Sequence, residues 1–272
     1  MRDQAWITGP ATHPLRRTFG LAHLAPLAAS NGVTATVLVQ TIPVPEETPE
    51  LLVLADGGGL VAGVVGWVDL TAADVTERIA ALQAGPAGDR LIGIRHPVQD
   101  EPDPDWLIRP AVLRGLRAVT TAGLAYDLLT LPHQLSVATS AVRSVPELRF
   151  ILDHGSKPPI RSGEIEHWVT GIRKLAVSPN VACKLSGLIT EADWKNWTVR
   201  ALRPYADVLL DAFGPQRLMF GSDWPVCLLA GTYGQVVAAT DELTAELSDA
   251  ERAEIFSGTA RAWYHLGLAS RQ

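Results

Sequence analysis

The amino-acid sequence predicts an α/β protein, a (β/α)8 TIM barrel of parallel strands, and three observations support this fold class. Apolar residues make up 47% of the 272 residues and charged residues 19%, as in a chain that buries a large core. Short apolar runs alternate with amphipathic stretches, which is the pattern of repeated βαβ units. No linker rich in Pro or Ser interrupts the alternation, so we expect a single domain over residues 1–272.

Seven runs rich in Val, Leu and Ile are the expected strands. They are almost continuously apolar, which is typical of parallel strands that are covered on both faces. The strands are expected at 34–40, 61–70, 91–98, 124–130, 149–155, 181–187 and 217–224, and helical spacing predicts helices at 72–83, 106–121, 134–144, 164–177, 200–213 and 235–247. Asp105 is the expected N-cap of the second of these helices.

The beginning of the chain lacks the pattern of a buried strand. A closed barrel of this kind needs eight strands, and the sequence supplies seven. Residues 1–20 carry Pro10, Pro14 and the Arg16-Arg17 pair and are expected to form a loop. We therefore expect the first strand to be missing from this chain, through a start codon placed too late or through a true loss.

Charge and cysteine content exclude several classes of function. The net charge is -6 and the charges are scattered, whereas binding to nucleic acid needs clustered Lys and Arg. No apolar run reaches membrane-spanning length, and the first residues lack a signal-peptide pattern. Cys183 and Cys227 are too few for a disulfide framework, so they are interpreted as the reduced thiols of a cytoplasmic protein.

Polar side chains are concentrated where the expected strands end. In barrel enzymes the active site is built from the carboxyl ends of the strands and the loops that follow them. The side chains at these ends are Gln40, Trp67, Asp69, Arg95, His96, Asp127, His154, Lys184, Ser186, Asp223 and Trp224. Because barrel interiors are otherwise filled with apolar side chains, this set predicts a functional site.

Asp223 and His154 are the expected catalytic residues. A carboxylate at the end of the strand in LMFGSDWPV can take a proton from water or hold a metal ion. His154, in LDHGSK, can ligate a metal or polarise a carbonyl group. Alternatively, Asp223 is a loop or N-cap aspartate, and His154 is a core histidine whose hydrogen bonds are made within the protein. Asp153 points to the other side of its strand and is expected to be structural.

Two cationic strand ends are expected to bind substrate. The guanidinium of Arg95 offers a fork of donors to a carboxylate or a ring oxygen, with His96 beside it. The alternative for this pair is a salt bridge to an acidic residue of the following loop: Asp100, Glu101 or Asp103. Lys184 lies inside a strand and needs a partner, for which Asp223 and Asp153 are the candidates.

Three further side chains complete the expected substrate site. Trp67 and Trp224 can pack on the apolar face of a sugar ring. The alternative, which is the more frequent role of such residues, is packing in the rim or the core of the protein. Gln40 ends the first of the seven strands. The sequence contains no G-x-S-x-G elbow, P-loop or dinucleotide fingerprint at the start of a helix.

Six segments carry a resemblance to a known family. They are TVLVQ (36–40), GVVGWVDL (63–70), GIRHPVQDEPDPDWL (93–107), LDHGSKPPI (152–160), KLSGLITEADW (184–194) and RLMFGSDWPVCLL (217–229). The chain resembles the amidohydrolase-related (amidohydrolase 2) sugar lactonases, a group with members acting on L-fucono- and L-rhamnono-lactone. The resemblance covers nearly the whole chain, and its last three segments are the most specific.

The resemblance implies a distorted barrel and hydrolysis of a lactone to an aldonate. In this family a His-x-His pair on the first strand, a histidine after the sixth and an aspartate after the eighth surround the reacting water. His154 and Asp223 match the last two positions, but no His-x-His occurs in the sequence. Catalytic zinc usually has three protein ligands. We therefore assign no cofactor to this sequence. One divalent metal ion, zinc, is expected only if the first strand is restored.

The expected function is the opening of a sugar-acid lactone by water that Asp223 activates. Two alternatives stay open: a decarboxylase or aromatic-acid lactone hydrolase of the same superfamily, and a non-catalytic barrel, since the His-x-His pair is absent. The expected partner is a small-molecule sugar lactone. An open barrel would expose strand edges, which also favours a homodimer.

Overall fold

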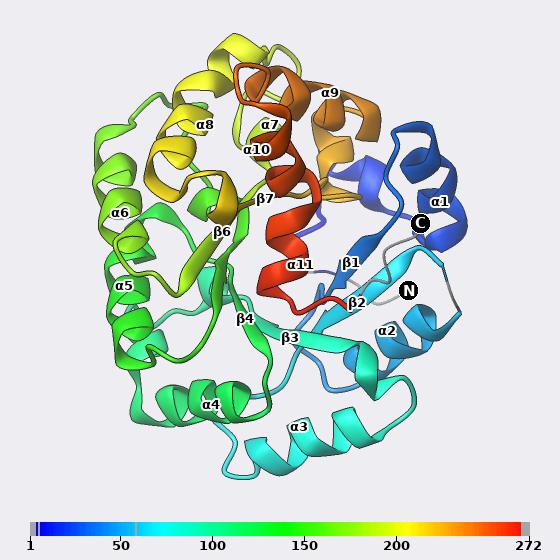
Figure 1. Cartoon of the computed structure of the whole chain (residues 1–272), viewed down its shortest axis with the longest axis vertical. Helices are drawn as coiled ribbons and strands as arrows, with labels where there is room; N and C mark the ends of the chain where they lie inside the picture. The colour runs from blue at the N-terminus through cyan, green and yellow to red at the C-terminus, as the bar shows by residue number, and fades with distance from the viewer. Residues whose placement is uncertain (1–3, 5, 58, 268–272) are drawn as a thin grey trace.

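A computed structural model describes residues 4, 6–57 and 59–267, and its centre is one parallel sheet that curls like part of a barrel (Figure 1). The strands follow one another in the sheet in chain order, and they are β1 (Thr36–Val39), β2 (Val61–Gly66), β3 (Leu91–His96), β4 (Ala125–Leu128), β5 (Phe150–Leu152), β6 (Val181–Leu185) and β7 (Leu218–Phe220). The seven expected strands are thus confirmed. The described residues form no eighth strand, so β1 and β7 are the edges of an open sheet.

Most of the helices cover the outer face of the sheet, and the last of them lies at one end of it (Figure 1). The helices are α1 (Leu21–Ser30), α2 (Glu47–Asp56), α3 (Val75–Ala84), α4 (Pro110–Thr121), α5 (Leu135–Ser144), α6 (Glu166–Ala176), α7 (Leu188–Glu191), α8 (Val199–Phe213), α9 (Tyr233–Leu243), α10 (Asp249–Ala253) and α11 (Thr259–Trp263). The six predicted helices are confirmed as α3 to α6, α8 and α9, whereas α1, α2, α7, α10 and α11 were not predicted. None of the described helices has the length and apolarity to span a membrane.

The expected start of α4 at Asp105 is wrong. Residues Trp106–Ile108 form a separate 3-10 turn, and α4 begins at Pro110. Arg109 has ψ 138, because the residue before a proline is driven out of the helical region. Pro110 then fits the first helical position, where its missing N–H leaves no hydrogen bond unmade.

All seven strands are shorter than predicted, and after β5 and β7 the residues expected to end the strand form turns. The segment after β5 forms a 3-10 turn, Asp153–Ser156, in which His154 has a φ of 54°. The segment after β7 leaves the sheet before Asp223, which has a φ of 52°. A positive φ is uncommon for residues other than glycine and is often associated with functional sites.

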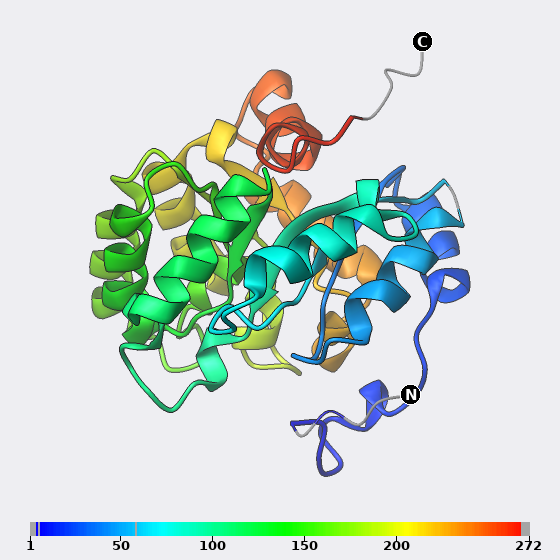
Figure 2. The ribbon, with the colours of Figure 1, turned by 90° about the horizontal axis from the view of Figure 1, so that it is seen from below.

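Buried side chains pack on both faces of the sheet. The large core lies between the sheet and its helices and includes Val64, Ile94 and Leu116. Inside the curl, Val65, Ala125, Ile151, Ala182 and Met219 come from successive strands β2 and β4 to β7 and pack with Tyr264. Figure 2 shows α11 at one end of the sheet and the N-terminal segment at the other. The C-terminal residues therefore close the amino end of the curl.

Candidate functional site

Four charged side chains meet inside the curl, two residues further along their strands than its apolar layer. Lys184 Nζ lies 2.5 Å from Asp127 Oδ2 and 2.6 Å from Asp153 Oδ1. Arg95 Nη1 lies 2.7 Å from Asp153 Oδ2, and Nη2 donates to the carbonyl oxygen of Gln40. Both carboxylates are fully buried, but each one contacts a cation, so the cluster has two charges of each sign.

The titration of these groups follows from their burial and their neighbours. Burial raises the pKa of Asp127 to about 6, although the Lys184 ammonium opposes this rise. Burial also pushes the pKa of Asp153 upward, but Lys184 and Arg95 outweigh it and leave this pKa below its usual value. The two carboxylates outweigh burial at Lys184 and raise its pKa. Lys184 is therefore a permanent cation that neutralises buried carboxylates.

The partners in this cluster differ in part from those considered from the sequence. Of the two candidates for Lys184, the structure shows Asp153 rather than Asp223, together with Asp127. Arg95 contacts Asp153 instead of the acidic loop after its strand. Both cations are therefore engaged by carboxylates within the sheet.

His96 and Trp67 lie together, but their polar atoms are already used. Trp67 Nε1 donates to His96 Nδ1 at 3.0 Å, so the proton of the neutral ring is on Nε2. His96 Nε2 lies 2.7 Å from Glu101 Oε1, which is the loop contact considered as an alternative. The ring stacks on Trp106 with centroids 4.2 Å apart. Burial lowers the pKa of His96, which favours the neutral ring in this chain of contacts.

The remaining substrate-binding candidates lie in different surroundings. Gln40 is 1% exposed, and its Nε2 donates to the carbonyl oxygen of Arg95 at 3.4 Å. Trp224 packs edge to face on Phe19, with ring centroids 5.2 Å apart. The Arg17 guanidinium lies over the ring of Phe19. The N-terminal segment therefore forms part of the rim beside Trp224, a contact that the sequence did not reveal.

His154 and Asp223, the expected catalytic residues, are brought together at the carboxyl ends of β5 and β7. His154 Nε2 lies 3.7 Å from Asp223 Oδ1, and the two side chains are 13% and 15% exposed. The other ring nitrogen, Nδ1, lies 2.7 Å from Ser186 Oγ. Burial lowers the pKa of His154, although Asp223 opposes this, so the ring is neutral near pH 7. The pair can present a base and a hydrogen-bond donor to one reacting group.

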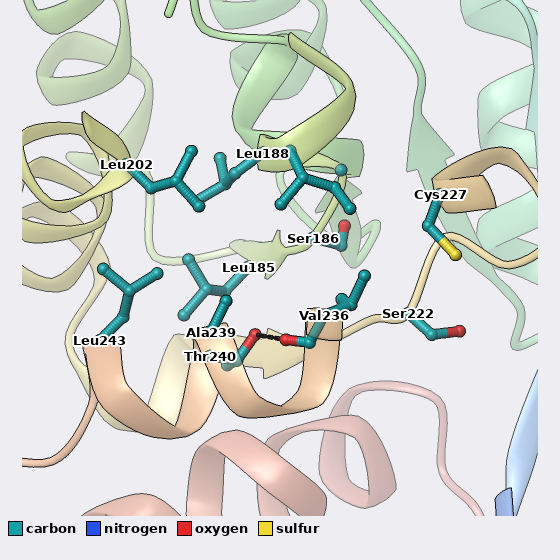
Figure 3. A pocket seen from close by; sticks show the side chains of 12 residues that line it. Leu185, Ser186, Leu188, Leu202, Ser222, Cys227, Val236, Ala239, Thr240 and Leu243 are labelled. Atoms are coloured by element: carbon teal, nitrogen blue, oxygen red, sulfur yellow. Dashed lines mark hydrogen bonds between the residues drawn. The ribbon is translucent and has the colours of Figure 1, made fainter. Parts of the chain in front are cut away.

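A small cavity lies behind this pair, between α7, α8 and α9 (Figure 3). Its volume of about 20 Å³ is close to the minimum for one water molecule. Its wall is mostly aliphatic, with Leu202, Val236 and Leu243, and includes the hydroxyls of Ser186 and Ser222. The cavity is too small to bind a sugar.

The described residues do not fit a metal site with three protein ligands. In this part of the chain no three His, Cys, Asp or Glu side chains are grouped so that they could hold an ion. His154 and Asp223 supply two donors. Between Asp127 and Asp153, the Lys184 ammonium occupies the position that a bridging cation would need.

Several residues around the site were not assigned from the sequence. Glu101 follows His96 by five positions, and it was named only as one of three possible loop contacts. Ser186 was noted at a strand end, but its contact with His154 spans 32 positions. The Tyr264 hydroxyl donates to Asp127 at 2.7 Å over 137 positions. No local pattern in the sequence signals contacts over such separations.

Comparison with known proteins identifies the family. Residues 2–266 match the model of the amidohydrolase family. The chain belongs to this family. It is 41% identical over 274 residues to an L-fucono-1,5-lactonase of Burkholderia ambifaria, covering 99% of this chain and 92% of the relative. It is 38% identical to an L-fucono-1,5-lactonase of Burkholderia multivorans, covering 97% of this chain and 91% of that one.

The same fold is found in a solved amidohydrolase. A crystal structure of an amidohydrolase from Burkholderia multivorans with bound zinc has a TM-score of 0.91 and is 37% identical, covering 96% of this chain and 93% of the other. The α/β fold and the amidohydrolase family expected from the sequence are therefore confirmed. The zinc ion is a property of that relative, and among the residues described here His154 and Asp223 are the two neighbouring donors.

Proposed function

We propose that this amidohydrolase is a lactonase that hydrolyses a sugar-acid lactone of the L-fucono-1,5-lactone type to the open aldonate. One observation carries the proposal: His154 and Asp223 face each other at the carboxyl ends of the strands, in a chain similar over nearly its full length to two L-fucono-1,5-lactonases. The chemistry that this pair can perform is attack of water on a carbonyl group.

Asp223 is the proposed base. Its carboxylate takes a proton from a water molecule, and the resulting hydroxide attacks the lactone carbonyl carbon. The carboxylic acid then returns the proton to the ring oxygen as the C–O bond breaks. The distance of 3.7 Å between His154 Nε2 and Asp223 Oδ1 is too long for a direct hydrogen bond, so both atoms can face the substrate.

His154 is the proposed donor to the carbonyl oxygen. As hydroxide adds, negative charge develops on this oxygen, and a positioned N–H group stabilises it. Arg95 and Lys184 were the other candidates for this role, but their charges are engaged by Asp153 and Asp127 inside the sheet. The neutral imidazole remains as the donor beside Asp223, since burial lowers its pKa.

A pH-indicator assay with a panel of aldonolactones tests the proposed reaction. L-fucono-, L-rhamnono-, D-galactono- and D-arabinono-lactone are each followed for acid release above the spontaneous rate. We expect turnover, with L-fucono-1,5-lactone as the best substrate. Absence of turnover with all four lactones would contradict the proposal, and release of carbon dioxide from an aromatic acid would assign the site to a decarboxylase instead.

A further inference from the structure

The imidazole of His154 is held by residues from the ends of other strands. Ser186 follows β6, and its Oγ lies 2.7 Å from His154 Nδ1. The next residue, Gly187, has a φ of 68°, and a Cβ there would lie 2.9 Å from Nδ1 and 3.0 Å from Cγ. The ring therefore packs directly on the glycine backbone, and any side chain at this position would displace it.

Ser186 is itself fixed from the opposite side. It is 4% exposed, and a Cβ on Gly221, which follows β7, would lie 2.9 Å from the Ser186 Cβ. Figure 3 shows Ser186 in the wall of the small cavity, with the aliphatic side chains of Leu185 and Leu188 nearby. Within the described part of the chain, the contact with His154 is the one hydrogen bond of this hydroxyl. This hydroxyl therefore serves the imidazole.

The surroundings of the two ring nitrogens differ, and this difference selects a tautomer. Nε2 faces the Asp223 carboxylate at 3.7 Å, so a proton on Nε2 is attracted to the negative charge, whereas a lone pair there is repelled. The proton of the neutral ring therefore belongs on Nε2. Nδ1 is then an acceptor, and the Ser186 hydroxyl, which can rotate to donate, supplies its hydrogen bond.

We propose that Ser186 is a positioning residue that holds His154 in the Nε2–H tautomer, so that the ring donates to the lactone carbonyl oxygen. The inference rests on the proposed lactone hydrolysis, which requires a donor where negative charge develops. With the proton on Nδ1, the ring would direct a lone pair at that oxygen and oppose the reaction. A hydroxyl that touches no substrate atom thereby controls a group that does.

Nitrogen-15 NMR of the histidine rings tests the tautomer directly, with His154 assigned by its absence from the spectrum of His154→Gln. At alkaline pH, where imidazole is neutral, wild type should show a protonated Nε2 and an unprotonated Nδ1. Ser186→Ala should show a mixture of the two tautomers and a kcat lowered about 10- to 100-fold, the usual effect of losing such a supporting contact. KM should change little, because the serine contacts no substrate.

Ser156→Ala is the matched control. Ser156 is fully buried, belongs to the same turn as His154, and shares a hydrogen bond of 2.8 Å with Thr130 instead of the imidazole. This variant also loses a buried hydroxyl, but it should keep the wild-type tautomer. Any loss of turnover from general loosening of the turn would appear in both variants, whereas the tautomer should change in Ser186→Ala alone.

A double-mutant cycle shows whether Ser186 acts through His154. If it does, Ser186→Ala should cause no further loss of kcat in the His154→Gln background. An unchanged Nε2–H tautomer in Ser186→Ala, or additive losses in the cycle, would overturn the inference. Failure of the proposed function has a separate sign, since wild type would then hydrolyse no lactone while the tautomer could still be read by NMR.

Discussion

Lys184 is the residue on which the buried charges inside the sheet depend. Its ammonium contacts the carboxylates of Asp127 and Asp153, both fully buried, at 2.5 and 2.6 Å. Without it, two like charges would share a site with only Arg95 to balance them. Breaking a buried ion pair by removing one member is costly, since the other member stays in a medium that solvates charge poorly.

Lys184→Met should therefore destabilise the protein strongly. We expect the free energy of unfolding to fall by about 3–5 kcal/mol, measured by chemical denaturation. Lys174→Met is the control, because Lys174 is exposed on α6 and such substitutions change stability by about 0.5 kcal/mol or less. Equal stability of the two variants would show that the cluster is not held together by Lys184.

At the residue scale, the sequence predicts which side chains gather at the strand ends better than it predicts their contacts. Strand ends alone were enough to select His154 and Asp223, which the structure brings to 3.7 Å. The contacts of Arg95 depend on how strands align, and β3 places it opposite Asp127 while its side chain reaches Asp153. Such alignment over more than 30 positions is a property of the tertiary structure.

The turn between β6 and α7 is the element that shapes the candidate site. Gly187 has a φ of 68°, which a residue with a Cβ adopts at a cost of about 1–2 kcal/mol. Its backbone also contacts the His154 ring, since an added Cβ would lie 2.9 Å from Nδ1. The glycine thus meets two requirements, one from the backbone and one from the imidazole.

Gly187→Ala should lower kcat by at least about tenfold, because the methyl group would displace the imidazole and misplacement near 1 Å is costly in catalysis. Gly163→Ala separates this effect from backbone strain. Gly163 has a φ of 75° with nothing within 4 Å of an added Cβ. Both variants should lose similar stability, and kcat should fall only in the first. A similar kcat for both would contradict the placement of His154 on Gly187.

At the element scale, continuous apolar runs identified all seven strands, but not where they end. The prediction extended β5 through His154 and β7 through Asp223, where the chain has already turned. Apolar periodicity does not detect these turns, because they depend on the positive φ of His154 and Asp223. Helices α1 and α2 were missed, and their apolar stripes are weak, with Pro26 inside α1.

For the whole molecule, Tyr264 links the C-terminal helices to the charged interior. It follows α11, packs with the apolar side chains inside the curl, and donates from its hydroxyl to both oxygens of Asp127 at 2.7 and 2.9 Å. Burial raises the pKa of this phenol, and Asp127 adds to the rise, so the hydroxyl stays protonated as a donor. Tyr264 thereby joins the segment after α11 to the residues inside the curl.

Tyr264→Phe should destabilise the whole fold by about 2 kcal/mol, because the buried Asp127 carboxylate loses the hydroxyl donor and keeps only Lys184. Tyr205→Phe is the matched control, since the Tyr205 hydroxyl makes one long contact of 3.4 Å with a backbone oxygen. We expect the control to lose less than about 1 kcal/mol in the same denaturation experiment. A smaller loss in Tyr264→Phe than in Tyr205→Phe would refute the closing role of Tyr264.

At the scale of the whole molecule, alternation of strands and helices predicted the α/β class and the open sheet of seven strands, which the structure confirms. It did not predict how the ends of the chain are used. The His13–Leu15 turn lies against residues 226–229, and Tyr264 fills the curl from its amino end. These contacts join segments far apart in sequence and depend on the shape of the completed sheet.

The measurement that tests the central claim most directly is the kcat of Asp223→Asn on L-fucono-1,5-lactone, beside wild type and Asp211→Asn. Asp211 is an exposed carboxylate on α8, so its variant controls for the loss of one charge. If Asp223 is the base, Asp223→Asn should lose about 10²- to 10⁴-fold in kcat, and Asp211→Asn should match wild type. Near-normal turnover by Asp223→Asn would contradict the account.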